Sequence, residues 1–162
     1  MEFGNLIRKM VAAVEHGDGT GVAACFTPDG VYNDVFYGSF QGIAIADMIE
    51  NYFHRDACNF RWDIHDPVTG PADRSGESVG YARYVFSYES ALVASKGRRA
   101  IFEGVAVCRL RDGLIAEYHE VANAATGLHG IGFPPERLAK FIGKQNDALK
   151  ARAESARHLA ET

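Results

Sequence analysis

The pattern of apolar residues changes after about residue 57, and this change constrains the fold more than any other feature of the sequence. Before it, apolar residues recur every three or four positions, as in segment 3–14, which is typical of amphipathic helices. After it, the segments 59–68, 78–90 and 99–123 alternate between apolar and polar residues, which is typical of strands. Helices gathered before a long-stranded antiparallel sheet predict an α+β fold.

Turn and capping residues divide these regions into elements. We expect the first helix to end near Gly17, Thr20 to cap a short second helix, and a third helix to cover roughly 43–54. A first strand is predicted at 30–42, and the turn 111–113 makes a hairpin of the last alternating segment. Helices on the concave side of a curved sheet would leave a pocket between the two layers.

A final helix is predicted from the proline pair at 134–135, since proline suits a first helical turn. We expect residues 1–134 to form one α+β domain and residues 135–162 to form a C-terminal helical extension of that domain. The extension carries a narrow apolar stripe, Leu138, Phe141, Ile142 and Leu149. We expect the first three of these residues to dock near the mouth of the pocket or across a dimer.

Composition argues against several classes of function. The 162 residues suit one globular domain, and the formal net charge of −4 with no basic run argues against nucleic-acid binding. No apolar run approaches the length that spans a membrane, and the N-terminus lacks the order of a signal peptide. We therefore expect a cytoplasmic protein with neither a nucleic-acid nor a membrane partner.

The sequence carries no motif for a metal or a cofactor. Cys25, Cys58 and Cys108 form no Cys-x-x-Cys pair, so we interpret them as reduced thiols in or near the core. The six histidines show no metal-ligand spacing, and the segment GLHGIG lacks the spacing of a dinucleotide fingerprint. We predict neither a metal site nor a cofactor.

Three segments together resemble the nuclear-transport-factor-2-like superfamily, especially its SnoaL-like and ketosteroid-isomerase-like branch. They are HGDGTGVAACF, GVYNDVFYGSFQGIAIADMI and RDGLIAEYHEVAN. The resemblance implies a cone-shaped α+β roll, with helices on the concave face of a curved antiparallel sheet. Its cavity would hold a small apolar molecule, and its open sheet face would form a homodimer. Members include isomerases, dehydratases, epoxide hydrolases, polyketide cyclases and binding modules, so the fold alone selects no function.

Asp34 is the first candidate for a catalytic residue. The resemblance places an acidic base at this end of the first strand, and alternation puts Tyr32 on the same face. A carboxylate that points into an apolar cavity has a raised pKa and suits a general base. We expect Asp34 to be the most perturbed acid, with Tyr32 donating a hydrogen bond to it. Alternatively, Asp34 caps the turn at the end of a strand.

Glu120 is the second candidate acid. In the epoxide-hydrolase branch an acid that assists ring opening lies at the matching position. If Glu120 shares the cavity with Asp34, the two groups can divide the acid and base roles. Alternatively, Glu120 is an exposed residue beside His119 that pairs with an arginine of the next strand.

Arg83 and His65 are the remaining catalytic candidates. The resemblance suggests Arg83 as the arginine of a hydrolase pair, although Val85 stands where its aspartate partner would be. His65 resembles the histidine of dehydratase-like members, and a histidine in a pocket can serve as a general acid or base. Alternatively, the Arg83 head lies in solvent, and His65 is only hydrogen-bonded to a neighbouring aspartate.

The oxyanion donors of the steroid isomerases are missing, because Met10 and Ala106 occupy their positions, so we do not expect steroid isomerisation. The side chains that we expect to contact substrate are Tyr32, Trp62, Tyr118, Phe102 and Met10. The sequence thus predicts an isomerase-, dehydratase-, cyclase- or hydrolase-type acid–base enzyme acting on an apolar substrate. A non-catalytic ligand-binding or dimeric assembly module of the same fold is the alternative. The homodimer would form through Ile101, Val105 and Val107.

Overall fold

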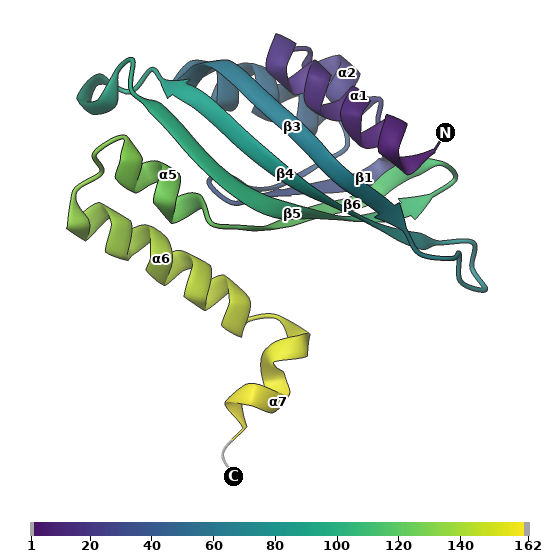
Figure 1. Ribbon diagram of the computed structural model, residues 1–162. Helices are drawn as coiled ribbons and strands as arrows, with labels where there is room; N and C mark the ends of the chain where they lie inside the picture. Colours follow the sequence, from purple (N-terminus) through teal and green to yellow (C-terminus); the bar gives the residue numbers. More distant parts are fainter. Residues whose placement is uncertain (1, 161–162) are drawn as a thin grey trace.

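The computed structural model describes residues 2–160 and shows a curved sheet with helices packed against it (Figure 1). Helix α1 (Phe3–His16) buries one apolar face and ends at Gly17, whose left-handed φ of 70° suits glycine. Helix α2 (Gly19–Ala23) follows at once. Its cap is Asp18, which accepts from the Gly21 amide, rather than Thr20 as we expected.

Residues 30–42 form the end of a hairpin rather than one strand. Strand β1 (Phe26–Asp34) turns at residues 35–37 and returns as β2 (Gly38–Gln41). Within β1, the register of the pairing with β6 shifts between Phe26 and Val31. Helical structure then runs through α3 (Ala44–Met48), the π-helical η1 (Ile49–Phe53) and α4 (His54–Asp56).

The remaining strands are β3 (Ala57–Thr69), β4 (Ser78–Ser90), β5 (Arg99–Arg111) and β6 (Leu114–Ala122), and the short helix η2 (Val93–Ser95) lies between β4 and β5. The order across the sheet is β2-β1-β6-β5-β4-β3. Every neighbouring pair is antiparallel except β1 and β6, which run parallel. The α+β roll is therefore confirmed, but its sheet is mixed rather than wholly antiparallel.

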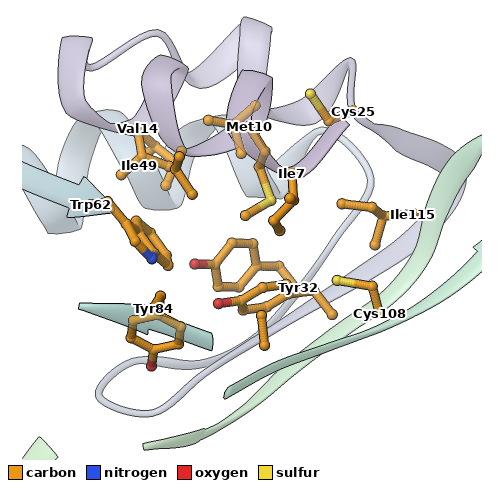
Figure 2. Close-up of a cluster of buried hydrophobic side chains, with 14 of the residues drawn as sticks. Ile7, Met10, Val14, Cys25, Tyr32, Ile49, Trp62, Tyr84, Cys108 and Ile115 are labelled. Carbon is orange, nitrogen blue, oxygen red and sulfur yellow. The ribbon is translucent and has the colours of Figure 1, made fainter. Parts of the chain in front are cut away.

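One face of the sheet is packed against the N-terminal helices. Alternate residues of the strands point toward these helices, and three tyrosines, Tyr32, Tyr84 and Tyr118, are fully buried there. Figure 2 shows Tyr84 beside Trp62, with ring centroids 5.6 Å apart, and Tyr32 below Met10 of α1. These side chains fill the narrow part of the roll, and two open spaces lie elsewhere, one near the ends of β1 and β6 and one lined partly by residues of β3 and β4.

The chain continues beyond the sheet in a series of short helices and one long helix. Helix α5 (Ala124–Gly130), which the sequence did not predict, packs Leu128 against Ala100 of β5. Helix α6 (Pro135–Lys150), η3 (Ala153–Ser155) and α7 (Ala156–Leu159) follow and extend away from the sheet (Figure 1). Within the described residues, no helix has the length and apolar character needed to cross a membrane.

Candidate functional site

Asp34 ends strand β1 and is buried. Its Oδ1 atom accepts hydrogen bonds from the backbone amides of Phe36 and Tyr37, each at 2.8 Å, and so holds the turn between β1 and β2. Burial raises the pKa of Asp34 to about 6, although these two amides act in the opposite direction. The Asp34 carboxyl group therefore caps the turn and also has a raised pKa. Each of the two alternatives that the sequence left open describes part of its environment.

Glu120 lies near the end of β6 and receives two phenol hydrogen bonds. Its Oε2 atom accepts from the hydroxyl of Tyr84 and, at 3.2 Å, from the hydroxyl of Tyr118. Burial, followed by the negative charge of Asp34, raises the pKa of Glu120 to about 8. Glu120, rather than Asp34, is thus the more perturbed acid, and its carboxyl group is mostly protonated at neutral pH.

Tyr84 reaches Glu120 by crossing the intervening strand. Tyr84 lies on β4, directly opposite Gly104 of β5, and Glu120 lies on β6 beyond it. A Cβ atom at position 104 would stand 2.6 Å from the Tyr84 hydroxyl oxygen. Gly104 therefore leaves the space through which the Tyr84 phenol passes. Glycine within a strand often marks such a close approach of a neighbouring group.

Asp34 and Glu120 both line a cleft of about 520 Å³. The cleft lies between the β1–β2 hairpin, β6 and the C-terminal segment, which contributes Ala148 and the η3 region. The other polar side chains in its lining are Asn33, Ser39, Glu117, His119, Gln145, Arg152 and Glu154. The guanidinium of Arg152 lies 3.5 Å from the carboxylate of Glu154. The carboxyl pair is thus placed in a polar cleft open to a ligand.

Four of the expected substrate contacts lie in the core instead of the cleft wall: Tyr32, Trp62, Tyr118 and Met10. They are buried because the N-terminal helices fill the narrow part of the roll. Neither the Tyr32 hydroxyl nor the Trp62 indole nitrogen has a hydrogen-bond partner among the described residues. The expected hydrogen bond from Tyr32 to Asp34 is therefore not formed, and Tyr118 instead acts through its bond to Glu120.

Arg83 and His65 lie on the outer face of the sheet, away from the cleft. They stand opposite each other on β4 and β3, and alternation turns them away from the buried Tyr84 and Trp62. The Arg83 guanidinium is half exposed and lies 3.5 Å from the carboxylate of Asp66. Neither residue therefore lies near Asp34 and Glu120. For Arg83, the structure agrees with the alternative in which its guanidinium lies in solvent.

A second, smaller cavity of about 190 Å³ lies on the other side of residues 35–37. Its lining is mainly aromatic and includes Phe36, Phe86 and Tyr88. Phe102, the fifth expected substrate contact, packs edge-on against Phe36 and Phe86, with ring centroids 6.0 and 5.4 Å away, so it supports this cavity. We refer to the two spaces as the polar cleft and the aromatic cavity.

The described residues 2–160 contain no cluster of three or more side chains suited to holding a metal ion. Cys25 and Cys108 are buried free thiols, whereas Cys58 is an exposed free thiol, which differs from its expected place near the core. None of the three belongs to the polar cleft. The chemistry available in the cleft is therefore that of carboxyl, amide, imidazole, hydroxyl and guanidinium groups.

Tyr84 is the residue of the candidate site that sequence reasoning missed. Alternation places Tyr84 on the same face of the strand as Ala82 and Phe86, and this pattern indicates an ordinary core residue. The useful signal was Gly104, an isolated glycine inside an alternating strand, because such a glycine marks a close approach. Its cross-strand partner could be identified only once the register of β4 and β5 was known.

The roll, its helices and a carboxyl pair in a lateral cleft define a protein of the nuclear-transport-factor-2-like class. A family model described as "SnoaL-like domain" matches residues 7–118, and the chain belongs to this family. No curated protein matches the chain. The solved structures that match share the fold at low sequence identity.

Three solved structures illustrate this likeness. TsrD from Streptomyces laurentii is 18% identical, with a TM-score of 0.63 over 80% of this chain and 93% of its own. An LEH-like epoxide hydrolase from M. tuberculosis is 16% identical, with a TM-score of 0.59 over 87% and 94%. A type 2 hexachlorocyclohexane dehydrochlorinase is 12% identical, with a TM-score of 0.62 over 74% and 84%.

Proposed function

We propose that the protein is an acid–base enzyme that acts on a small molecule in the polar cleft, with Asp34 as the base and Glu120 as the acid. One observation carries this proposal: the carboxyl groups of the buried Asp34 and the partly buried Glu120 face the same cleft, with pKa values of about 6 and about 8. Between these values Asp34 is mostly ionised while Glu120 is mostly protonated. Pairs of carboxyl groups whose environments separate their pKa values commonly divide acid and base roles.

The hydrogen bonds suggest how the roles divide. The Oδ1 atom of Asp34 is occupied by two amides, which leaves Oδ2 to take a proton from a substrate carbon or a water molecule. Both phenols donate to Oε2 of Glu120, so the acid proton belongs on Oε1, from which it can pass to a leaving group or a developing oxyanion. Isomerase-, dehydratase-, cyclase- and hydrolase-type reactions all fit this pair.

The lining of the polar cleft supports a small substrate with both polar and apolar parts, rather than the mostly apolar molecule that the sequence predicted. Val35, Ala148 and Ala153 offer apolar contact, and Asn33 and Gln145 offer hydrogen bonds. The names of two compared structures, an epoxide hydrolase and a dehydrochlorinase, support small-molecule chemistry in this fold. We further propose a cytoplasmic homodimer that associates through the outer face of the sheet.

The test compares wild type, Asp34→Asn and Glu120→Gln on a panel of small carbonyl compounds, epoxides and alkyl halides. We expect each variant to lose about 100-fold to 10,000-fold in kcat/KM, with a bell-shaped wild-type pH profile bounded near pH 6 and pH 8. His65→Gln, on the outer face, is the control and should retain activity. Equal activity in all four proteins would refute the proposal, and ligand binding without turnover would instead support the binding-module alternative.

A further inference from the structure

We propose that the aromatic cavity binds a small organic cation of the alkylammonium class. This site is separate from the polar cleft, from which residues 35–37 divide it. The proposal does not rest on the acid–base function, because it concerns different side chains and a different kind of attraction. It rests on the aromatic lining, on the sign of the charge in that lining, and on the cation contacts that nearby rings already make.

The rings in the lining come from several separate elements of the fold. Phe36 precedes β2, Phe86 and Tyr88 lie on β4, Phe60 lies on β3, and Phe141 lies on α6. Neighbouring rings are in contact, with centroids 5.5 Å apart for Phe36 and Phe141 and 5.7 Å apart for Phe86 and Tyr88. The face of an aromatic ring carries a negative quadrupolar potential that attracts a cation, and an aromatic lining is apolar enough to accept the methyl groups of that cation.

The charge in the lining has the sign that a cation requires. Among the described lining residues, Asp56 is the one with a charged side chain. The Tyr37 hydroxyl donates to Asp56 Oδ2 at 2.9 Å, and Arg55 donates to both oxygens of the same carboxylate. The Arg55 side chain is 59% exposed and does not belong to the lining. Asp34 lies behind the wall of residues 35–37. Burial, followed by the charges of Asp34 and Asp56, raises the pKa of Tyr88 to about 12.

Two rings at or near the rim already bind cations of the protein itself. The guanidinium carbon of Arg137 lies 4.4 Å from the centroid of Phe133, which lines the cavity. The guanidinium carbon of Arg55 lies 5.2 Å from the ring centroid of Tyr52, and the Tyr52 ring packs against Tyr37. These contacts lie within the distance at which cation–π attraction is significant. Inside the cavity, no lining residue supplies such a cation.

A matched pair of ligands distinguishes cation binding from simple apolar binding in this cavity. Choline and 3,3-dimethylbutan-1-ol have nearly the same shape, but only choline is charged. Calorimetry would measure both affinities, and Trp62 fluorescence gives a second signal because its ring lies 4.8 Å from that of Phe86. We expect choline to bind at least about tenfold more tightly, the size expected from one or two desolvated cation–π contacts. Equal or weaker binding of choline would refute the proposal.

Variants locate the bound cation. Tyr88→Leu should weaken choline binding at least about fivefold, whereas Tyr88→Phe keeps the ring and should bind as wild type. Asp56→Asn should weaken choline binding but leave 3,3-dimethylbutan-1-ol unaffected. Glu120→Gln removes the proposed acid and should leave choline affinity unchanged. If Glu120→Gln abolishes choline binding while Tyr88→Leu does not, the cation binds in the polar cleft and the proposal is wrong, whatever the outcome for catalysis.

Discussion

At the scale of single residues, the most informative contact is the hydrogen bond from Tyr84 to Glu120. This bond favours the charged form of Glu120 and so partly offsets the effect of burial. Tyr84→Phe should therefore raise the pKa of Glu120 further above about 8 and lower stability by about 1 kcal/mol. Carbon-13 NMR of labelled glutamate measures the pKa shift, and chemical denaturation measures the stability.

Tyr81→Phe is the matched control for this prediction. It also removes a tyrosine hydroxyl from β4, but Tyr81 lies on the opposite, exposed face of that strand. It should change neither the pKa of Glu120 nor the free energy of unfolding. If the two variants behave alike, Tyr84 does not hold Glu120 in solution.

The raised pKa values also predict how stability depends on pH. Folding raises the pKa of Glu120 from 4.5 to about 8 and that of Asp34 from 3.8 to about 6, so the folded state binds these protons more tightly than the unfolded state. Stability contributed by these groups is therefore lost as pH rises from about 4 to about 8. Thermal melts should show Tm falling through this range, and Glu120→Gln should flatten the decline between pH 6 and pH 8. An unchanged slope in the variant would contradict the assignment.

At the scale of elements, Gly104 couples three strands, because it admits the Tyr84 hydroxyl across β5. Gly104→Ala would place a Cβ atom 2.6 Å from that oxygen and 2.8 Å from the Val121 carbonyl oxygen. We expect a loss of about 1–3 kcal/mol, as for other overpacked sites. Gly143→Ala in α6 is the control, since its Cβ would meet nothing within 4 Å and alanine favours the helix by about 0.5–1 kcal/mol.

Helix α6 has no buried residue, and the structure attaches it to the sheet mainly through its partly buried side chains. Phe141 stacks on Phe36, and the Gln145 side chain donates to the Val35 carbonyl at 2.9 Å. Phe141→Ala should therefore lower the free energy of unfolding by about 1–2 kcal/mol and expose apolar surface to a dye. Ile142→Ala should be nearly neutral, because Ile142 is exposed rather than docked as its place in the apolar stripe suggested.

The elements also show what sequence reasoning could reach. Alternation predicted β4 at residues 78–90 and the β5–β6 hairpin, because long alternating segments have one interpretation. The same pattern did not separate β1 from β2, because the turn residues Val35, Phe36 and Tyr37 are as apolar as the strands beside them. Helix α5 was missed because seven residues with two glycines show no helical period.

The candidate site was predictable to a similar extent. Parity correctly placed Tyr32 and Asp34 on one face, and the resemblance pointed to Glu120. Alternation does not say which of the two faces of a strand is covered by helices. That answer depends on the docking of α1, so Arg83 and His65 were assigned to a cavity that they do not line.

At the scale of the whole molecule, the outer face of the sheet predicts self-association. Ile101, Val105 and Val121 are exposed on neighbouring strands, and an apolar face of this kind is commonly covered by a partner. We expect sedimentation to show a dimer at micromolar concentration and Val105→Arg to shift it toward the monomer. Leu159→Arg, a similar change at an exposed site on α7, should leave the dimer intact. A monomeric wild type would overturn this prediction.

The parallel pairing of β1 with β6 has a consequence for the order in which the chain folds. Asn33 donates to the Tyr118 carbonyl across 85 residues of sequence, whereas β3 to β6 pair with their neighbours through connections of a few residues. Closing so long a loop is slow and costs entropy, so the four-stranded meander can assemble before the N-terminal strand docks. Asp34 meets Glu120 only in that last step. Local opening of β1, seen as early hydrogen exchange at its amides, would therefore dismantle the site while most of the sheet stays folded.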